Sequence, residues 1–121
     1  MNNYYVYAFL DPRDSVVRYI GQGVGRRFRW WRRIEKGDIP QYGVRPWLQK
    51  LKETGLEPIV FIVLERLTKE QKNRWEIDLI DLIGRVSEGT GPLLNLSSGG
   101  EGTTGLSAAP VKSTESLEYV R

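Results

Sequence analysis

Tyrosines gather in two short segments near the start of the chain. Tyr5 and Tyr7 alternate within residues 4–10, Tyr-Tyr-Val-Tyr-Ala-Phe-Leu, and Tyr19 lies within residues 16–21, Val-Val-Arg-Tyr-Ile-Gly. If the two segments are the strands of a hairpin, Tyr5 and Tyr7 share one face and Tyr19 comes close to them. Phenols in this arrangement can orient water or exchange a proton with it, whereas the alternative interpretation is plain core packing.

Basic side chains cluster directly after these segments. Between Arg26 and Lys36 there are six cations and a single acid, Glu35, although the net charge of the chain is only +3. A cluster of this kind suits a polyanion such as nucleic acid, and a solvated helix face is the alternative interpretation. The six cations are Arg26, Arg27, Arg29, Arg32, Arg33 and Lys36.

The composition excludes several kinds of site. The 121 residues include no cysteine and no histidine, which excludes disulfides, thiolate or imidazole metal sites and a Ser-His-Asp triad. Hydrolytic chemistry would have to use carboxylates, tyrosines, lysines, arginines or a hard metal ion held by oxygen. The chain has no basic leader and no apolar run near the roughly 20 residues of a membrane helix. We therefore expect a soluble, cytoplasmic protein with no membrane partner.

The elements that must position these residues are two strands followed by two helices. Residues 4–10 and 16–21 predict the strands of a hairpin, and the three glycines of residues 21–25 are expected to end the second strand. A cationic helix is predicted over residues 26–36. A second, shorter helix is predicted over residues 45–54, with a glycine directly after it as a C-terminal cap.

The second half of the chain adds one strand and one helix. Residues 59–64, Ile-Val-Phe-Ile-Val-Leu, give the strongest strand signal and predict a strand that is buried on both faces. Thr68 and Gln71 fit a capping box that begins a helix. This helix is predicted to continue to about Ile83 and to end at Gly84.

The length and the order of these elements predict one folded domain. Two strands joined by a tight turn pair antiparallel, so we expect an α/β (α+β) fold with a small, three-stranded, mainly antiparallel sheet flanked by helices. The domain is predicted to span residues 1–102. Residues 103–121 are poor in large apolar side chains and are expected to form a flexible polar tail.

One acidic side chain of the last helix has an unusual position. Glu76 lies four residues before Ile80 and seven before Ile83, so it shares their apolar stripe. A carboxylate there is costly unless a positive charge compensates it, and either a divalent cation or a nearby arginine can do so. Asp78 and Asp81 fall on other faces of the helix and are expected to be solvated.

Four ordered motifs resemble the GIY-YIG nuclease superfamily, and among its branches the phage-borne and mobile-element members. Tyr5-Val6-Tyr7 followed by Tyr19-Ile20-Gly21 is similar to the two motifs that give the family its name. The resemblance implies a three-stranded antiparallel sheet with one metal ion at a shallow, basic, DNA-binding face. It continues in Gly21-Gln22-Gly23-Val24-Gly25-Arg26-Arg27, in Leu67-Thr68-Lys69-Glu70 with Glu76-Ile77-Asp78-Leu79-Ile80, and in Gly91-Pro92-Leu93-Leu94-Asn95-Leu96 with Gly99-Gly100-Glu101-Gly102.

The resemblance also implies a role for each matching residue. Tyr7 corresponds to the general base, and Tyr19 to a residue that either orients the attacking water or hydrogen-bonds to Tyr7. Glu76 corresponds to the ligand of one Mg²⁺ ion, for which Mn²⁺ can substitute. Arg27 is expected to stabilise the transition state, with Arg29 as the alternative. Supporting roles fall to Tyr5, Gly21 and Asn95. The side chains expected to contact DNA are those of Arg26, Arg29, Trp31, Arg32, Arg33 and Lys36.

Two positions depart from the pattern of this branch. Gln22 stands where lysine is usual, which removes one phosphate contact, and Trp31 stands where histidine is common. Trp31 either stacks on a base or packs beneath the arginine side chains. The sequence therefore predicts a Mg²⁺-dependent endodeoxyribonuclease, with a nucleic-acid-binding module of weak or no cleavage activity as the alternative. DNA is the expected partner, and a homodimer or a separate specificity partner remains open.

Overall fold

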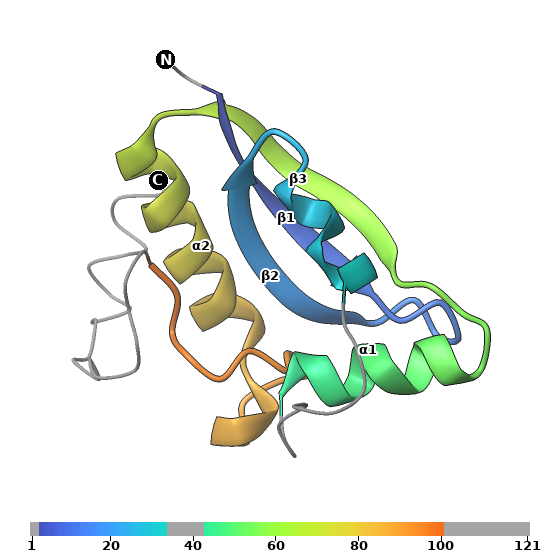
Figure 1. Cartoon of the computed structure of the whole chain (residues 1–121). Helices are drawn as coiled ribbons and strands as arrows, with labels where there is room; N and C mark the ends of the chain where they lie inside the picture. The colour runs from blue at the N-terminus through green and yellow to red at the C-terminus, as the bar shows by residue number, and fades with distance from the viewer. Residues whose placement is uncertain (1–2, 34–42, 101–121) are drawn as a thin grey trace.

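The computed structural model describes residues 3–33 and 43–100, and its centre is a three-stranded antiparallel sheet (Figure 1). The central strand β1 (Tyr4–Leu10) pairs with β2 (Val17–Val24) on one side and with β3 (Ile59–Leu67) on the other. The α/β fold class and the antiparallel sheet predicted from the sequence are confirmed. Lys36 and the predicted C-terminal tail lie outside the described residues.

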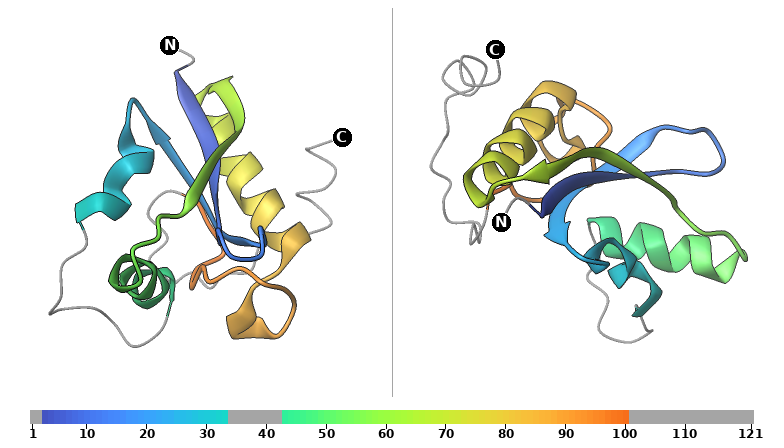
Figure 2. Two further views of the ribbon diagram at one scale, coloured as in Figure 1. Left: turned by 90° about the vertical axis from the view of Figure 1, so that its right-hand side faces the viewer. Right: turned by 90° about the horizontal axis from the view of Figure 1, so that it is seen from above.

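Helices cover both faces of the sheet. Helix α2 (Lys69–Ile83) packs on one face, whereas the 3₁₀ helix η1 (Arg27–Arg33) and helix α1 (Val44–Glu53) lie on the other (Figure 2). A short 3₁₀ helix, η2 (Val86–Glu88), follows α2. In the described part of the chain, no helix combines the length and the apolar character needed to span a membrane.

The two faces of β1 carry different side chains. Tyr5, Tyr7 and Phe9 point toward η1 and α1, and Val6 and Ala8 point toward α2, as the two-residue period of a strand requires. All five are buried. β1 is therefore the strand that is buried on both faces, because it has a neighbour on each side and helices above and below.

Helix α2 begins and ends as its sequence predicts. The Thr68 hydroxyl accepts a hydrogen bond of 3.1 Å from the Gln71 backbone N–H, and the Gln71 side chain accepts one of 2.9 Å from the Thr68 N–H. This capping box is confirmed. The helix ends at Gly84, whose φ is 94°, and a Cβ there would lie 2.2 Å from the Thr90 carbonyl oxygen. Only glycine fits this turn without moving the backbone.

A buried carboxylate joins helix α1 to the hairpin. Asp11 directly follows β1 and is 2% exposed. It accepts hydrogen bonds from the Arg13 guanidinium, at 2.7 and 2.9 Å, and from the Trp47 indole N–H of α1 at 2.9 Å. The hydrogen bonds from Arg13 hold the pKa of this carboxyl well below its usual range. Asp11 thus fixes α1 against the turn between β1 and β2.

Two expectations about the strands are wrong. β2 does not end at its glycines but continues to Val24, with Gly21 and Gly23 paired to β1, because the missing side chains leave room for tyrosine rings and for Arg27. The cationic segment is helical as predicted and forms a 3₁₀ helix over its described residues. β3 is an edge strand with Ile59 and Phe61 exposed, since a continuous apolar run does not determine whether a strand has one neighbour or two.

One expectation about α2 is also wrong. Asp78 is 4% exposed and therefore buried, whereas Asp81 is exposed as expected. The helix contacts both the sheet and the glycine segment at Gly99 and Gly100. It therefore buries more of its circumference than the single apolar stripe visible in the sequence.

Candidate functional site

Two tyrosines meet above a glycine in the hairpin. Tyr7 of β1 lies opposite Gly21 of β2, and Tyr19 is two residues before that glycine on the same face. A Cβ added to Gly21 would lie 2.5 Å from both the Cζ and the hydroxyl oxygen of Tyr7, and 2.8 Å from Cε2 of Tyr19. The phenols therefore fill the space that any other residue at position 21 would need. Gly21 lets both hydroxyls reach the edge of the sheet.

The Tyr7 side chain is buried and that of Tyr19 is half-buried. The Trp30 indole N–H donates to the Tyr7 hydroxyl at 2.7 Å, and the Tyr19 ring lies beside the Tyr7 ring, with 6.2 Å between the ring centres. Burial raises the pKa of Tyr19 to about 12, and it raises the pKa of Tyr7 well above the usual range of a phenol. The hydrogen bond from Trp30 acts in the opposite direction on Tyr7, because it stabilises the phenolate. Both groups are protonated at neutral pH in the free protein.

Glu76 approaches the tyrosines from the other face of the sheet. It belongs to α2, is 7% exposed, and lines a pocket of about 400 Å³ together with Tyr19, Asn95 and Gly100. Its negative charge raises the pKa of Tyr19 and, to a smaller extent, that of Tyr7. The carboxylate and the phenols thus come together around the edge strand β2, although they belong to opposite layers.

Hydrogen bonds hold one oxygen of the Glu76 carboxylate. The Gln22 side-chain amide donates to Oε1 at 2.9 Å, and the Gly100 backbone N–H donates to the same oxygen at 2.7 Å. Burial raises the pKa of Glu76, and these two hydrogen bonds and the charge of Lys72 lower it in part. Within the described residues, no hydrogen bond reaches Oε2. That oxygen is the one placed to accept a further positive partner.

A buried lysine lies behind this carboxylate. Lys72 stands one helical turn before Glu76 and is 3% exposed. Its ammonium group donates to Oε1 of Gln22 and lies 4.9 Å from the centre of the Tyr4 ring. The amide group of Gln22 donates in turn to Glu76. Gln22 is therefore a polar bridge between a buried cation and a buried carboxylate. The resemblance, in which lysine is usual at this position, indicated only the loss of a phosphate contact.

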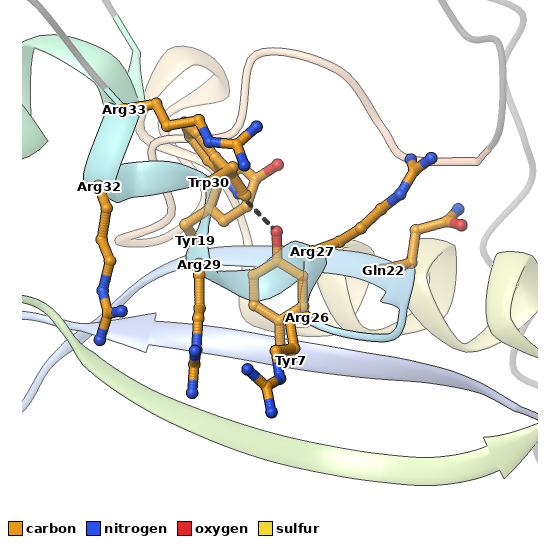
Figure 3. A pocket seen from close by; sticks show the side chains of 9 residues that line it. All are labelled: Tyr7, Tyr19, Gln22, Arg26, Arg27, Arg29, Trp30, Arg32 and Arg33. Atoms are coloured by element: carbon orange, nitrogen blue, oxygen red, sulfur yellow. Dashed lines mark hydrogen bonds between the residues drawn. The ribbon is translucent and has the colours of Figure 1, made fainter.

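The arginines form the wall of a large pocket beside the tyrosines. Its volume is about 820 Å³, and Figure 3 shows the Trp30 indole directed at the Tyr7 hydroxyl inside it. The Arg27 side chain extends on the side where Gln22 lies, whereas Arg29 extends in the opposite direction (Figure 3). The lining residues are Tyr7, Tyr19, Gln22, Trp30 and the arginines Arg26, Arg27, Arg29, Arg32 and Arg33.

Tyr5 fixes the segment that carries these arginines. Its hydroxyl donates to the Gly25 carbonyl at 2.9 Å and accepts from the Phe28 backbone N–H at 3.2 Å. A Cβ on Gly23 would lie 3.0 Å from Cβ of Arg27, so this arginine packs directly against the β2 backbone. Tyr5 and Gly23 together determine where η1 begins and where Arg27 lies.

Asn95 continues the edge of the sheet without being part of a strand. Its side-chain oxygen accepts from the Ile20 N–H at 3.0 Å, and its amide donates to the Ile20 carbonyl at 2.8 Å. These two bonds satisfy the outer backbone groups of β2 beside Tyr19, which would otherwise be buried without partners. Asn95 therefore holds the strand that carries Tyr19 and Gly21.

The 3₁₀ form of η1 determines which tryptophan faces the tyrosines. With three residues per turn, side chains three apart lie above one another, so Trp30 shares a row with Arg27 and Arg33, and Trp31 does not. The family resemblance singled out Trp31, because histidine is common at that position, whereas the structure brings Trp30 to Tyr7. Trp30, Gln22 and Lys72 are the site residues that sequence analysis missed.

The arrangement fits one hard metal ion held by few protein ligands. In the described ranges, no three acidic side chains gather as a ready metal cage. Mg²⁺ does not need one, because it keeps several waters and often takes one or two carboxylates together with substrate phosphates. A buried carboxylate with one oxygen that accepts no hydrogen bond from the described residues is suited to this mode. Glu76 is the side chain that would hold the ion.

The four residues with expected catalytic roles are brought to one edge of the sheet. Tyr7, Tyr19 and Arg27 line the arginine pocket, and Tyr19 shares the second pocket with Glu76. Of the residues expected to contact DNA, the described arginines line the arginine pocket, whereas Trp31 does not. No protein family, curated protein or solved structure matches the chain. The similarity to GIY-YIG nucleases therefore rests on its motifs, and any activity derived from them is a proposal.

Proposed function

We propose that this protein is a Mg²⁺-dependent endonuclease that hydrolyses phosphodiester bonds of DNA. One observation carries the proposal: the phenols of Tyr7 and Tyr19, the buried carboxylate of Glu76 and a wall of arginines come together around the edge of β2. A phosphodiester needs a group that removes a proton from water, a clamp for the phosphoryl oxygens and a positive charge near the leaving oxygen. The side chains at this edge match these three needs.

The arginine pocket provides the clamp. Guanidinium groups bind phosphoryl oxygens with two parallel hydrogen bonds and stay charged at all physiological pH values. Arg27 is preferred over Arg29 as the residue at the scissile phosphate, because it packs against Gly23 and extends on the Gln22 side. The other arginines of the pocket would hold neighbouring phosphates.

The tyrosines provide the proton acceptor and its orientation. Tyr7 would take a proton from the attacking water as a phenolate, and the Trp30 N–H would stabilise the negative charge on its oxygen. Tyr19, whose ring lies beside that of Tyr7, would hold the water in line with the phosphorus. Because burial raises the pKa of Tyr7, a bound cation and the arginines must favour the phenolate when substrate is present.

Glu76 would hold the metal ion through Oε2, the oxygen to which no described residue donates a hydrogen bond. Gln22 and Gly100 keep its other oxygen in place, and Lys72 helps to keep the carboxylate charged before the ion binds. When bound, Mg²⁺ lowers the pKa of coordinated water and stabilises charge on the phosphoryl and leaving oxygens. A DNA substrate also fits the cytoplasmic location expected from the sequence.

A plasmid-nicking assay with and without Mg²⁺ tests the proposal. Wild-type protein should cut only with the metal ion, and Glu76→Gln should lower the rate at least about 100-fold, because it removes the charge that binds the cation. Asp81→Asn is the matched control, since it makes the same change at an exposed position of the same helix. Salt-sensitive DNA binding should be retained in Glu76→Gln, because the arginines supply the phosphate contacts.

One observation favours a second candidate function. The pKa of Tyr7 lies far above neutral, as it would in a domain that binds nucleic acid without cutting it. In that case the arginine pocket would bind DNA equally well with or without Mg²⁺, and no protein concentration would nick the plasmid. Full cutting by Glu76→Gln would instead contradict Glu76 as the metal ligand, and the proposed DNA-binding role of the arginine pocket would still stand.

A further inference from the structure

A third pocket lies between η1 and the end of α1. Its volume is about 350 Å³, within the range of roughly 300–1,000 Å³ that is usual for small-molecule sites. Trp31 of η1 forms one wall, and the end of α1 and the segment after it form the others. The lining residues are Trp31, Arg32, Leu48, Lys52, Gly55, Leu56, Glu57 and Pro58.

The lining suits a flat, largely apolar group with polar edges. The Trp31 indole lies beside Leu48, Leu56 and Pro58, and the Arg32 guanidinium lies 5.4 Å from the centre of the indole ring. Indole rings and guanidinium planes both stack on nucleobases. The Glu57 carboxylate can accept hydrogen bonds from the exocyclic amino groups of a base.

Charge connects this pocket to the arginine pocket. Arg32 lines both of them, and Lys52 adds a second cation at the Trp31 side. A ligand that reached from one pocket to the other would therefore place anionic groups along cations and a planar group against Trp31. A nucleotide within a DNA strand has this combination of a phosphate backbone and a stacking base. The volume admits a base but not a paired and stacked duplex.

We propose that this third pocket, beside Trp31, binds one unpaired nucleobase of a DNA strand whose phosphates occupy the arginine pocket. The proposal rests on the nucleic-acid binding proposed above and adds a substrate preference to it. Bases in a duplex are paired and stacked, so inserting one requires it to leave the helix. Single-stranded DNA, or a junction with unpaired nucleotides, offers such a base without that cost. The protein should therefore bind unpaired DNA more tightly than a duplex.

Fluorescence anisotropy without Mg²⁺ measures this preference while avoiding cleavage. A labelled single-stranded oligonucleotide and the matching duplex are titrated with wild-type protein and with Trp31→Leu at one salt concentration. The variant should bind the single strand roughly tenfold less tightly, as expected for the loss of one base-stacking contact, and should bind the duplex unchanged. Trp31→Phe should retain most of the single-strand affinity, because a phenyl ring also stacks.

Two further variants separate the pocket from general effects. Leu56→Glu places a carboxylate in the pocket without changing the indole, and it should cause the same selective loss. Phe61→Leu removes an aromatic side chain that is 58% exposed on β3, and it should leave both affinities unchanged. Thermal unfolding of each variant shows whether it is folded. If Trp31→Leu is not folded, Leu56→Glu and Trp31→Phe decide the question.

The outcomes distinguish this inference from the proposed function. An equal loss for single strand and duplex in Trp31→Leu and Leu56→Glu, or no loss for either, overturns the base pocket. Salt-sensitive binding of DNA by the wild type would then still support the arginine pocket. If the wild type binds neither DNA in a salt-sensitive manner, the proposed function fails, and the base pocket fails with it.

Discussion

The two faces of β1 are built in opposite ways. Toward α2 the strand presents Val6 and Ala8, which pack with Ile20, Ile80 and Leu93 in an aliphatic cluster. Toward η1 it presents aromatic side chains, of which Tyr5 and Tyr7 carry hydroxyls that accept hydrogen bonds from Phe28 and Trp30 of η1. Apart from Tyr4 at the first position of β1, the side chains on the α2 face have no polar atoms, whereas the other face buries hydroxyls that each need a partner.

Along β1, side chains that stabilise the fold therefore alternate with side chains that belong to the proposed site. An aliphatic core gains free energy from buried area, and its side chains have no polar partners to lose. A buried hydroxyl gains little net free energy and costs much if its partner is removed. Alternate residues of β1 should therefore respond differently to substitution. Changes on the α2 side should alter folding, and changes on the η1 side should alter the proposed activity.

The largest effect is expected on the aliphatic side. Leu93 is fully buried in the cluster beneath α2, and Leu93→Ala should lower the free energy of unfolding by about 2–5 kcal/mol, through lost burial and the cavity left behind. Urea denaturation followed by circular dichroism measures this change. Cutting per folded molecule should stay close to that of the wild type, because Leu93 lines neither the arginine pocket nor the pocket that contains Glu76.

A large loss of specific activity in folded Leu93→Ala would contradict this separation. Leu82→Ala is the control for a leucine on the same side of the fold, because Leu82 is 70% exposed and its loss should change stability by less than about 0.5 kcal/mol. The comparison between the two leucines thus depends on burial alone.

The second effect is expected where the tyrosines cross β2. Gly21→Ala places a methyl group where the Tyr7 hydroxyl and the Tyr19 ring lie, so both phenols must move. A displacement of about 1 Å in reacting groups can cost roughly 100-fold in rate. The free energy of unfolding should fall by only about 1–3 kcal/mol, as for other overpacked sites. The nicking rate and urea denaturation together measure the two effects.

Gly23→Ala gives a graded control for this result. Its added methyl group would meet Cβ of Arg27 at 3.0 Å and the Tyr5 hydroxyl at 3.4 Å, which small shifts of η1 can relieve. Its rate should lie between those of the wild type and Gly21→Ala. Equal rates for Gly21→Ala and the wild type would mean that the phenols do not act at the edge of β2.

The sequence predicted the elements that depend on local patterns. A run of aromatic and branched residues indicated β1, the capping residues Thr68 and Gln71 located the start of α2, and the short turn between residues 4–10 and 16–21 implied a hairpin. The buried position of Glu76 followed from its apolar stripe. These features are determined by residues that are close in the chain, and such residues can be compared without coordinates.

What the sequence did not predict depends on contacts between distant segments. The exposed face of β3 follows from the strand order, which a run of apolar residues does not encode. The bridge from Lys72 through Gln22 joins residues 50 positions apart. The 3₁₀ form of η1 is fixed by Tyr5, which binds the Phe28 backbone N–H from another element. Patterns within one segment cannot reveal such contacts.

The smallest of the three effects concerns a single hydrogen bond on the aromatic side. Trp30→Phe keeps a ring against Phe9 and Tyr19 but removes the N–H that donates to Tyr7. One hydrogen bond to a charged group is worth about 1.5–3 kcal/mol, so the nicking rate at neutral pH should fall roughly tenfold or somewhat more. Stability should change less, because the neutral phenol loses only one weak partner.

The pH dependence of cutting tests whether this bond acts on the phenolate. The Trp30 N–H lowers the pKa of Tyr7, so its removal should raise that pKa and shift the alkaline rise of the nicking rate to higher pH. Trp31→Phe, one residue later on a different face of η1, should leave the pH profile unchanged. A uniform loss of rate at every pH in Trp30→Phe would mean that the indole only positions Tyr7, and the proton acceptor would then have to be sought at the metal-bound water.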